Sequence, residues 1–486
     1  MNAEVSFSSL QELISELVSG VPPPRQLQVV QQALAIAPSN DLEMRAMLHV
    51  SLGNALMAIS RGDRSGNTAA AIAAYRDALS AVSGVRRAQV LVKLGLALMK
   101  QDDARGESMA DEAIAAFESA LAELHDKSGR PEILIQTAIA YQIRTAGDRA
   151  ENQQRAIQLL EEAVNSSSKS SNPRGWASAA TQLAMAYADD SAKDRSESIK
   201  RATQYYLEAL GVMRTVSPND PEITSVLNNL AAAYSDLGLY DRSAMLYSDV
   251  IGKWIQEFGP NHVKVASSLN NLGVVLVNQA RFDEAEKLFR RALSIREGVL
   301  GSQHPDVAQT LNNLASICSR QGKLAEAVAL YSRALSLREE LLGPTHPDLA
   351  ASLNNEAEAL IGLREFDRAE ALLRRSLSIG LDTQGENSPQ VAATASNLGS
   401  LYYERGDYYA AEREFRRALN ATEWSLGATH PDMAIRLANL GRVSMTLGDL
   451  SSARSFLERA YSLSESALGV SHPSTSEIGQ LLSSMR

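Results

Sequence analysis

Cysteine is almost absent: Cys318 is the only one among 486 residues. A single cysteine excludes an intrachain disulfide and a cysteine-rich zinc site, and it is compatible with a reducing compartment. No nucleophile motif surrounds it. We therefore expect Cys318 to serve as a small apolar core residue.

Long apolar runs and a basic amino terminus are also missing. Residues 1–20 carry Glu4, Glu12 and Glu16 where a signal peptide needs an apolar stretch. No window approaches the roughly 18 apolar residues that cross a bilayer. We expect a soluble, cytoplasmic protein that does not insert into a membrane.

Positive charge is in deficit as well. The formal net charge is −10 and the isoelectric point is near 5.4. Binding to nucleic acid or to anionic lipid requires dense Lys and Arg surfaces. The composition therefore predicts no nucleic-acid partner, although it leaves room for local basic patches.

The dominant feature of the sequence is a 42-residue repeat, which starts at Asp220 and runs on without insertions. Each copy holds two helical patterns. In residues 305–322 the apolar positions recur every three or four residues, as on one face of a helix that ends at Gly322, and residues 323–343 form the second pattern. One helix pair cannot bury its own apolar faces, so the copies must stack.

This pattern resembles the tetratricopeptide repeat (TPR) family. Its consensus positions are filled by Leu314, Ala315, Cys318, Gly322, Ala327, Tyr331 and Ala334. The 42-residue form resembles the repeats of kinesin light chain and its bacterial relatives. The resemblance implies an all-α fold, a right-handed α-solenoid of about ten helix pairs closed by a capping helix after His472.

We expect two arrays, because residues 217–486 carry the strict repeat and residues 1–216 carry a looser form. The looser part holds four helix pairs after a partial first pair, whose second helix matches residues 29–38. It resembles the TPRs attached to bacterial CHAT-type peptidases.

Three loops of the first array share an acidic-Arg signature, at residues 61–67, 146–152 and 192–198. They lack the glycine density and the Lys-Ser/Thr pair of a P-loop, and their aspartate would repel phosphate. We expect Asp and Arg to tie each loop to the next helix. Asn67, Asn152 or Ser198 would cap that helix.

Five histidines recur at multiples of 42 residues: His262, His304, His346, His430 and His472. A metal site would need ligands within about 2.1 Å of one ion, but equivalent positions in stacked helices are about 8 to 10 Å apart. No Ser, Cys or acid recurs in a catalytic relation to them. Because Asp220 and Ser388 occupy the same register, we expect the histidines to cap helices.

The asparagines are the better candidates for binding. One mid-helix column holds Asn229, Asn271, Asn313, Asn355, Asn397 and Asn439, and the preceding residues Asn228, Asn270, Asn312 and Asn354 double it. The TPR resemblance implies that this column faces the concave groove. Its amides would bind the backbone of a peptide, or bridge to the backbone of the neighbouring repeat, or do both.

Charge in this groove is sparse. The positions one turn before the asparagines are Ser225, Ser267, Gln309, Ala351, Ala393 and Ile435. None is cationic, which disfavours a carboxylate clamp. Arg320, Glu358, Glu404 and Arg442 are scattered charges that could select a ligand.

A second column lies on the second helices and holds Arg291, Arg333, Arg375, Arg417 and Arg459. The resemblance places it on the convex side. We interpret it as a solvated face with Glu284, Glu326 and Glu370 as acidic neighbours. A basic stripe for an acidic partner is the alternative.

These observations predict a non-enzymatic adaptor that needs no cofactor and binds a peptide segment of a partner protein in its groove. One alternative is a regulatory or sensing array that controls a separately encoded effector, such as a CHAT-type peptidase or an ATPase switch. Another is an accessory protein of a biosynthetic enzyme. Self-association through terminal repeats is a further option.

Overall fold

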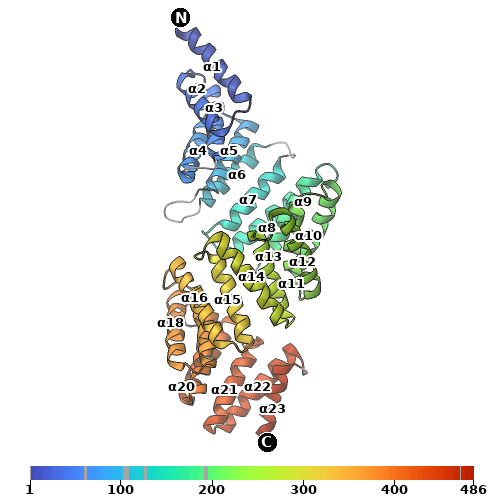
Figure 1. Cartoon of the computed structure of the whole chain (residues 1–486), viewed down its shortest axis with the longest axis vertical. Helices are drawn as coiled ribbons and strands as arrows, with labels where there is room; N and C mark the ends of the chain where they lie inside the picture. The colour runs from blue at the N-terminus through green and yellow to red at the C-terminus, as the bar shows by residue number, and fades with distance from the viewer. Residues whose placement is uncertain are drawn as a thin grey trace. The chain divides into compact units, whose positions relative to one another are not determined.

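The computed structural model describes residues 2–59, 63–101, 109–124, 129–190, 195–470 and 472–485. Within these ranges the chain consists of α-helices and connecting turns, and no strand occurs (Figure 1). The helices pack into two compact units, Met1–Leu246 and Tyr247–Arg486, here called the N-terminal and the C-terminal unit. The all-α prediction is confirmed.

The N-terminal unit contains the four predicted helix pairs and one more. Its helices are α1 (Asn2–Val18), α2 (Pro23–Ile36), α3 (Leu42–Ala58), α4 (Arg64–Leu79), α5 (Gly84–Leu98), α6 (Ala110–Glu123), α7 (Arg130–Ile143), α8 (Arg149–Ser166), α9 (Pro173–Ala188), α10 (Arg195–Val216) and α11 (Glu222–Asp236). Successive helices contact each other from α1 to α11. The first pair is therefore complete, because α1 packs against α2 through Leu10, which is buried with Ala33.

The next helix, α12 (Tyr240–Phe258), contains the point at which the chain is divided. The C-terminal unit continues with α13 (Val263–Asn278), α14 (Phe282–Leu300), α15 (Pro305–Arg320), α16 (Leu324–Leu342), α17 (Leu349–Gly362), α18 (Phe366–Gln384), α19 (Pro389–Arg405), α20 (Tyr408–Leu426), α21 (Asp432–Leu447), α22 (Leu450–Leu468) and α23 (Pro473–Ser484). The predicted capping helix is α23, which packs on α22.

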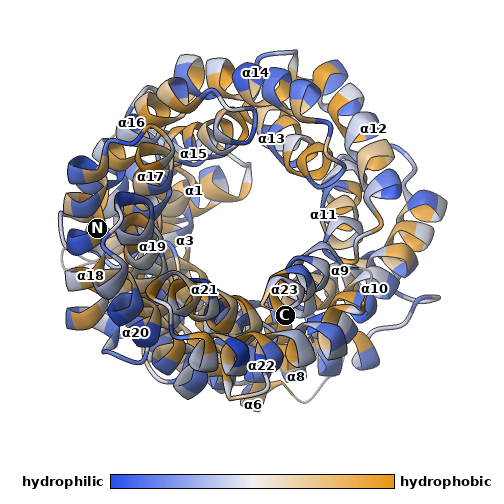
Figure 2. Cartoon of the chain, turned by 90° about the horizontal axis from the view of Figure 1, so that it is seen from below, coloured by the Kyte–Doolittle hydropathy of each residue, from blue (hydrophilic) through white to orange (hydrophobic). Residues whose placement is uncertain are grey.

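Within the C-terminal unit the odd and even helices take different sides. Figure 2 shows α13, α15, α17, α19 and α21 on the inner side and α14, α16, α18 and α20 outside them. Each helix contacts the next in sequence, and α13, α15, α17 and α19 also contact one another in turn. We call the surface of the five odd helices the inner face.

Small side chains allow the two layers to approach each other. Ala315 of α15 is fully buried, and Tyr331 and Ala334 of α16 are buried beside it. Cys318 is also fully buried, and burial raises the pKa of its thiol to about 11. The interpretation of Cys318 as a packing residue is confirmed.

Every recurring histidine stands at a helix start and accepts a hydrogen bond from a backbone N–H. The Nδ1 of His304 accepts from the amide of Asp306 at 3.1 Å. The same bond forms at His262, His346, His430 and His472. Ser388 accepts equivalently from Val391 at 3.3 Å. The capping prediction is confirmed, because each side chain supplies an acceptor for an otherwise unpaired amide.

The caps predicted for the acidic-Arg loops were wrong. Asp63 accepts from the amide of Gly66, and Asp148 from those of Ala150 and Glu151, so the aspartates cap α4 and α8. Asn152 instead lies inside α8 and donates to the carbonyl of Ala146. An acceptor must precede the first turn to reach its free amides, which Asn152 does not. The equivalent Asp194 lies outside the described residues.

Candidate peptide-binding face

The asparagine column lies on the odd helices, as predicted. Asn271, Asn313, Asn355, Asn397 and Asn439 lie on α13, α15, α17, α19 and α21, and Asn229 lies on α11 of the N-terminal unit. All six side chains are half-buried. Part of a half-buried amide contacts the protein, and the other part is accessible to solvent or to a ligand.

The preceding asparagines point more deeply into the protein. Asn270 is 3% exposed and Asn354 is 6% exposed, whereas Asn228 and Asn312 are half-buried. Buried amides require hydrogen-bond partners, since an unpaired polar group in the interior costs about 1 to 3 kcal/mol. In two of the four doublets, Asn270–Asn271 and Asn354–Asn355, a buried amide therefore precedes a half-buried one.

These amides bridge neighbouring repeats. Asn313 donates from Nδ2 to Oδ1 of Asn270 at 3.1 Å, and Asn355 donates likewise to Asn312 at 3.4 Å. The Nδ2 of Asn354 donates to Oγ1 of Thr394 on α19 at 3.0 Å. Bridging between repeats is thus found for Asn313 and Asn355, but the predicted backbone partner was wrong, because the acceptors are side chains. The backbone C=O groups in the middle of a helix already accept hydrogen bonds within that helix, whereas a side chain on the neighbouring helix is available as an acceptor.

At Asn439, the last of the column, the inner face is hollowed. A depression of about 60 Å³ is lined by Asn439, Arg442, Tyr403, Ser400 and Glu404. The guanidinium of Arg442 lies 5.5 Å from the ring centroid of Tyr403, a cation–π distance. Asn439 and Arg442 were predicted from the sequence, and the structure brings them together.

Two other predicted charges, Arg320 of α15 and Glu358 of α17, are exposed on the same unit. Both act electrostatically on Tyr331, whose pKa is raised mainly by burial. They lie on the first helices of adjacent repeats.

In the N-terminal unit Asn229 also borders a hollow, one of about 230 Å³. Tyr206, Asp189, Asp236 and Arg195 line it together with Asn229. The hydroxyl-bearing Tyr206 of this lining is buried, and burial raises its pKa. Asn229 thus shares this hollow with the second helix of the preceding pair, α10.

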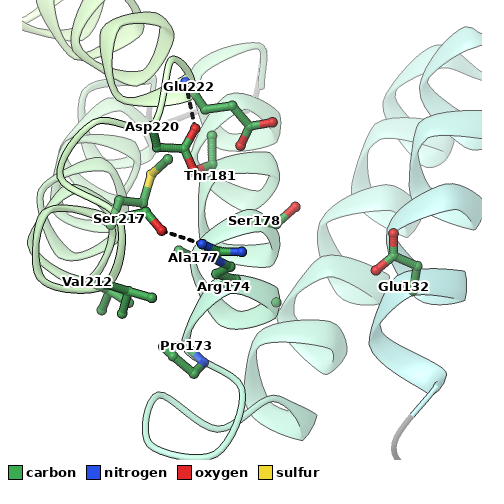
Figure 3. Close-up of a pocket in the computed structure, with 13 residues that line it drawn as sticks. Glu132, Pro173, Arg174, Ala177, Ser178, Thr181, Val212, Ser217, Asp220 and Glu222 are labelled. Atoms are coloured by element: carbon green, nitrogen blue, oxygen red, sulfur yellow. Dashed lines mark hydrogen bonds between the residues drawn. The ribbon is translucent and has the colours of Figure 1, made fainter.

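A larger hollow of about 340 Å³ lies between α7, α9, α10 and α11 of the same unit (Figure 3). Carboxylates of Glu132, Asp220 and Glu222 border it. Its one arginine, Arg174, donates to Oγ of Ser217 at 2.6 Å. Val212, Met213 and Val216 of α10 supply the apolar part of the lining. Sequence reasoning missed this hollow, because four separate helices, α7, α9, α10 and α11, contribute to it.

The outer arginines form ion pairs between repeats. Arg333 pairs with Glu297 at 2.5 Å and Arg459 with Glu423 at 3.1 Å; Arg375 pairs with Glu339 in the same way. Arg417 pairs with Glu386 and Glu414. The predicted acidic neighbours were wrong: Glu284 and Glu326 pair with Arg281 and Arg290, and Glu370 pairs with Arg374 and Arg405. Among the described residues, stacking brings four of the five arginines, all but Arg291, beside a glutamate of the preceding repeat.

A buried glutamate was also missed. Glu356 of α17 is 4% exposed and stands where the other strict repeats have leucine: Leu230, Leu272, Leu314, Leu398 and Leu440. Its Oε1 accepts from the hydroxyl of Ser332, while Oε2 has no partner among the described residues. Burial raises the pKa of this carboxyl. Comparison of the repeats with one another could have identified it.

Among the described residues, no helix is long and apolar enough to cross a membrane. The same part of the chain contains no group of three or more His, Cys, Asp and Glu side chains placed to hold a metal ion.

Comparison with known proteins agrees with this architecture. The tetratricopeptide repeat family model matches residues 222–298, 264–338, 306–382 and 390–466. No curated protein sequence matches the chain.

Several solved structures resemble it. BtubC (BKLC) from P. vanneervenii is 28% identical, with 48% of this chain and 91% of that chain covered and a TM-score of 0.40. The putative kinesin light chain TPR-like repeats of Podosopora anserina are 21% identical, with 43% and 99% covered and a TM-score of 0.39. The apo form of RapI is 13% identical, with 86% and 98% covered and a TM-score of 0.51, a likeness of fold alone. The family match and the stacked helix pairs identify the chain as a tetratricopeptide repeat protein with kinesin-light-chain-like repeats in its C-terminal half.

Proposed function

We propose that this protein is a non-enzymatic adaptor whose inner face binds an extended segment of a partner protein. Tetratricopeptide repeats form scaffolds for protein interactions in general, which makes a protein the expected class of partner. The single observation that carries the finer proposal is the column of half-buried amides at 42-residue intervals on the inner helices.

An amide carries both donors and an acceptor, so a row of them can bind peptide N–H and C=O groups without reading side chains. Sequence preference would then come from the groups beside the column. At the C-terminal end these are Arg442, Tyr403 and the exposed Ile435.

We assign different roles to different members of the column. Asn313 and Asn355 each donate a hydrogen bond to the neighbouring repeat and hold the helices in register. Asn397 and Asn439 have no such bond among the described residues, and Asn439 borders the hollow. We therefore expect these two to contact the partner directly.

The test uses a peptide selected from a random-sequence library on the full chain. Asn397→Ala combined with Asn439→Ala should weaken binding of that peptide by roughly tenfold or more, since each lost hydrogen bond is worth about 1 kcal/mol. Methylating the peptide's backbone nitrogens should weaken binding to the unmodified protein. Asn420→Ala, an exposed asparagine of the outer helix α20, is the matched control. Equal affinity of the double variant and the control would refute the inner-face proposal.

A further inference from the structure

Arginines surround another cavity of the N-terminal unit, which shares no lining residue with the hollow of Figure 3. This cavity measures about 600 Å³ and is bordered by Arg144, Arg149 and Arg195. They come from the connection after α7, the start of α8 and the start of α10. Three guanidinium groups at one cavity are unusual for a chain whose net charge is −10.

Two of these arginines come from the acidic-Arg loops. Arg149 belongs to the loop at residues 146–152 and Arg195 to the loop at 192–198. Stacking of the two helix pairs brings equivalent positions of successive repeats to one cavity. The third such loop contributes Arg64, which does not border it.

Asp148, the aspartate of the loop at residues 146–152, should repel a bound anion less strongly than the sequence alone suggests. Both amides that Asp148 binds, those of Ala150 and Glu151, belong to the first turn of its own helix. A capping carboxylate is already neutralised in part by the helix dipole. Asp148 itself does not border the cavity, and within the described part of the chain the carboxylate of the lining is that of Asp189.

The three arginines have guanidinium N–H groups that are not used in hydrogen bonds with the described residues of the protein and can donate to a ligand. Arg144 uses Nε for Asp111 at 2.5 Å and Nη1 for Asn152 at 3.2 Å, and Arg195 uses Nη2 for Asp236 at 3.1 Å. Arg149 has no hydrogen-bond or ion-pair partner among the described residues. A guanidinium has five N–H donors, so each of the three retains some. The pairs of Arg144 and Arg195 are solvent-accessible and therefore weak.

We propose that this cavity binds a phosphate-bearing small molecule, with Arg149 and Arg195 as its principal ligands. Guanidinium groups recognise phosphate through paired, charge-assisted hydrogen bonds. The volume lies within the range of about 300 to 1,000 Å³ typical of small-molecule sites. Gln142 and Tyr141 at the end of α7 add polar groups for the remainder of the ligand. The site shares Asp189 and Arg195 with the hollow at Asn229, but it does not rest on the adaptor proposal.

The test is calorimetric titration of the full chain with inorganic pyrophosphate at physiological salt. We expect saturable binding, and Arg149→Ala and Arg195→Ala should each raise the Kd about tenfold or more. Asp189→Asn should lower the Kd, because it removes the carboxylate that faces the anion. Arg64→Ala, the equivalent residue of the third loop, should leave the Kd unchanged.

Circular-dichroism melting of each variant separates a lost ligand from a lost fold, since all three arginines lie near the surface. Absence of pyrophosphate binding, or equal Kd values for Arg149→Ala and Arg64→Ala in folded proteins, overturns the proposal. A parallel titration with a phosphoserine peptide distinguishes the sources of phosphate. Binding of the peptide without binding of pyrophosphate would also overturn it.

Discussion

Asn313 on α15 donates a 3.1 Å hydrogen bond to the nearly fully buried Asn270 on α13, and so joins two successive repeats through their side chains. The two residues are 43 positions apart, one more than the repeat length. The second asparagine of one doublet thus binds the first asparagine of the doublet before it. Asn355 and Asn312 repeat the arrangement one step further on.

Asn313→Ala should lower the free energy of unfolding by about 1 kcal/mol, because Asn270 loses its donor in a buried site. Chemical denaturation monitored by circular dichroism measures this loss. Asn420→Ala on the outer helix α20 serves as the control and should have little effect. A stability of Asn313→Ala equal to that of the unmodified protein would show that the bond contributes nothing net.

His304→Ala should cost about 0.5 to 2 kcal/mol, the usual effect of removing a helix cap, since the amide of Asp306 loses its acceptor. His304→Ser should recover most of the loss, because Ser388 already caps α19 in the same register. Thermal melting of the three proteins compares them. If serine fails to restore stability while alanine lowers it, the histidine does something beyond capping.

Glu356→Gln should stabilise the protein at neutral pH. The folded pKa of Glu356 is raised above its ordinary value of 4.5, chiefly by burial. The native state therefore favours the protonated carboxyl, and stability falls as the pH rises above about 4.5 and through the folded pKa. Glutamine does not titrate, so its advantage should be small below pH 4.5 and grow to a plateau above the folded pKa.

Denaturation of both proteins across this pH range measures the difference. Glu339 acts to raise the pKa and Arg368 of α18 to lower it, and neither is changed by the substitution. A constant difference between glutamine and glutamate at every pH would contradict the assignment.

Two arginines of the C-terminal unit should differ in their contribution to stability. Arg296 is 4% exposed and donates to Oγ1 of Thr310 at 2.6 Å and to the carbonyl of Asp306 at 2.9 Å. Its replacement by alanine removes both of these hydrogen bonds together with a buried side chain, and should cost about 1 to 3 kcal/mol. Arg333, 47% exposed and paired with Glu297, should cost less than about 1 kcal/mol. Urea denaturation ranks the two; the reverse order would contradict the burial argument.

Much of this fold could be predicted from the sequence, because the residues that determine each helix pair lie within the repeat itself. The three- and four-residue spacing of apolar positions, the histidine caps and the small residues such as Ala315 act within one or two turns of helix. Repetition of the same register in six copies made the asparagine column visible as well. Caps in the looser repeats were predicted less well, because several polar residues compete near each helix start.

The sequence by itself determined the helix pairs, their order and the side of each helix on which the asparagines lie. Only the tertiary structure decided their partners, because those partners lie about one repeat away and depend on how the helices stack. Stacking places Asn313 within hydrogen-bond distance of Asn270 and Arg333 within ion-pair distance of Glu297. It also buries Glu356 and brings Arg149 and Arg195 to one cavity. Local periodicity carries no information about such distances, since contacts between repeats are fixed by packing and not by position along a helix.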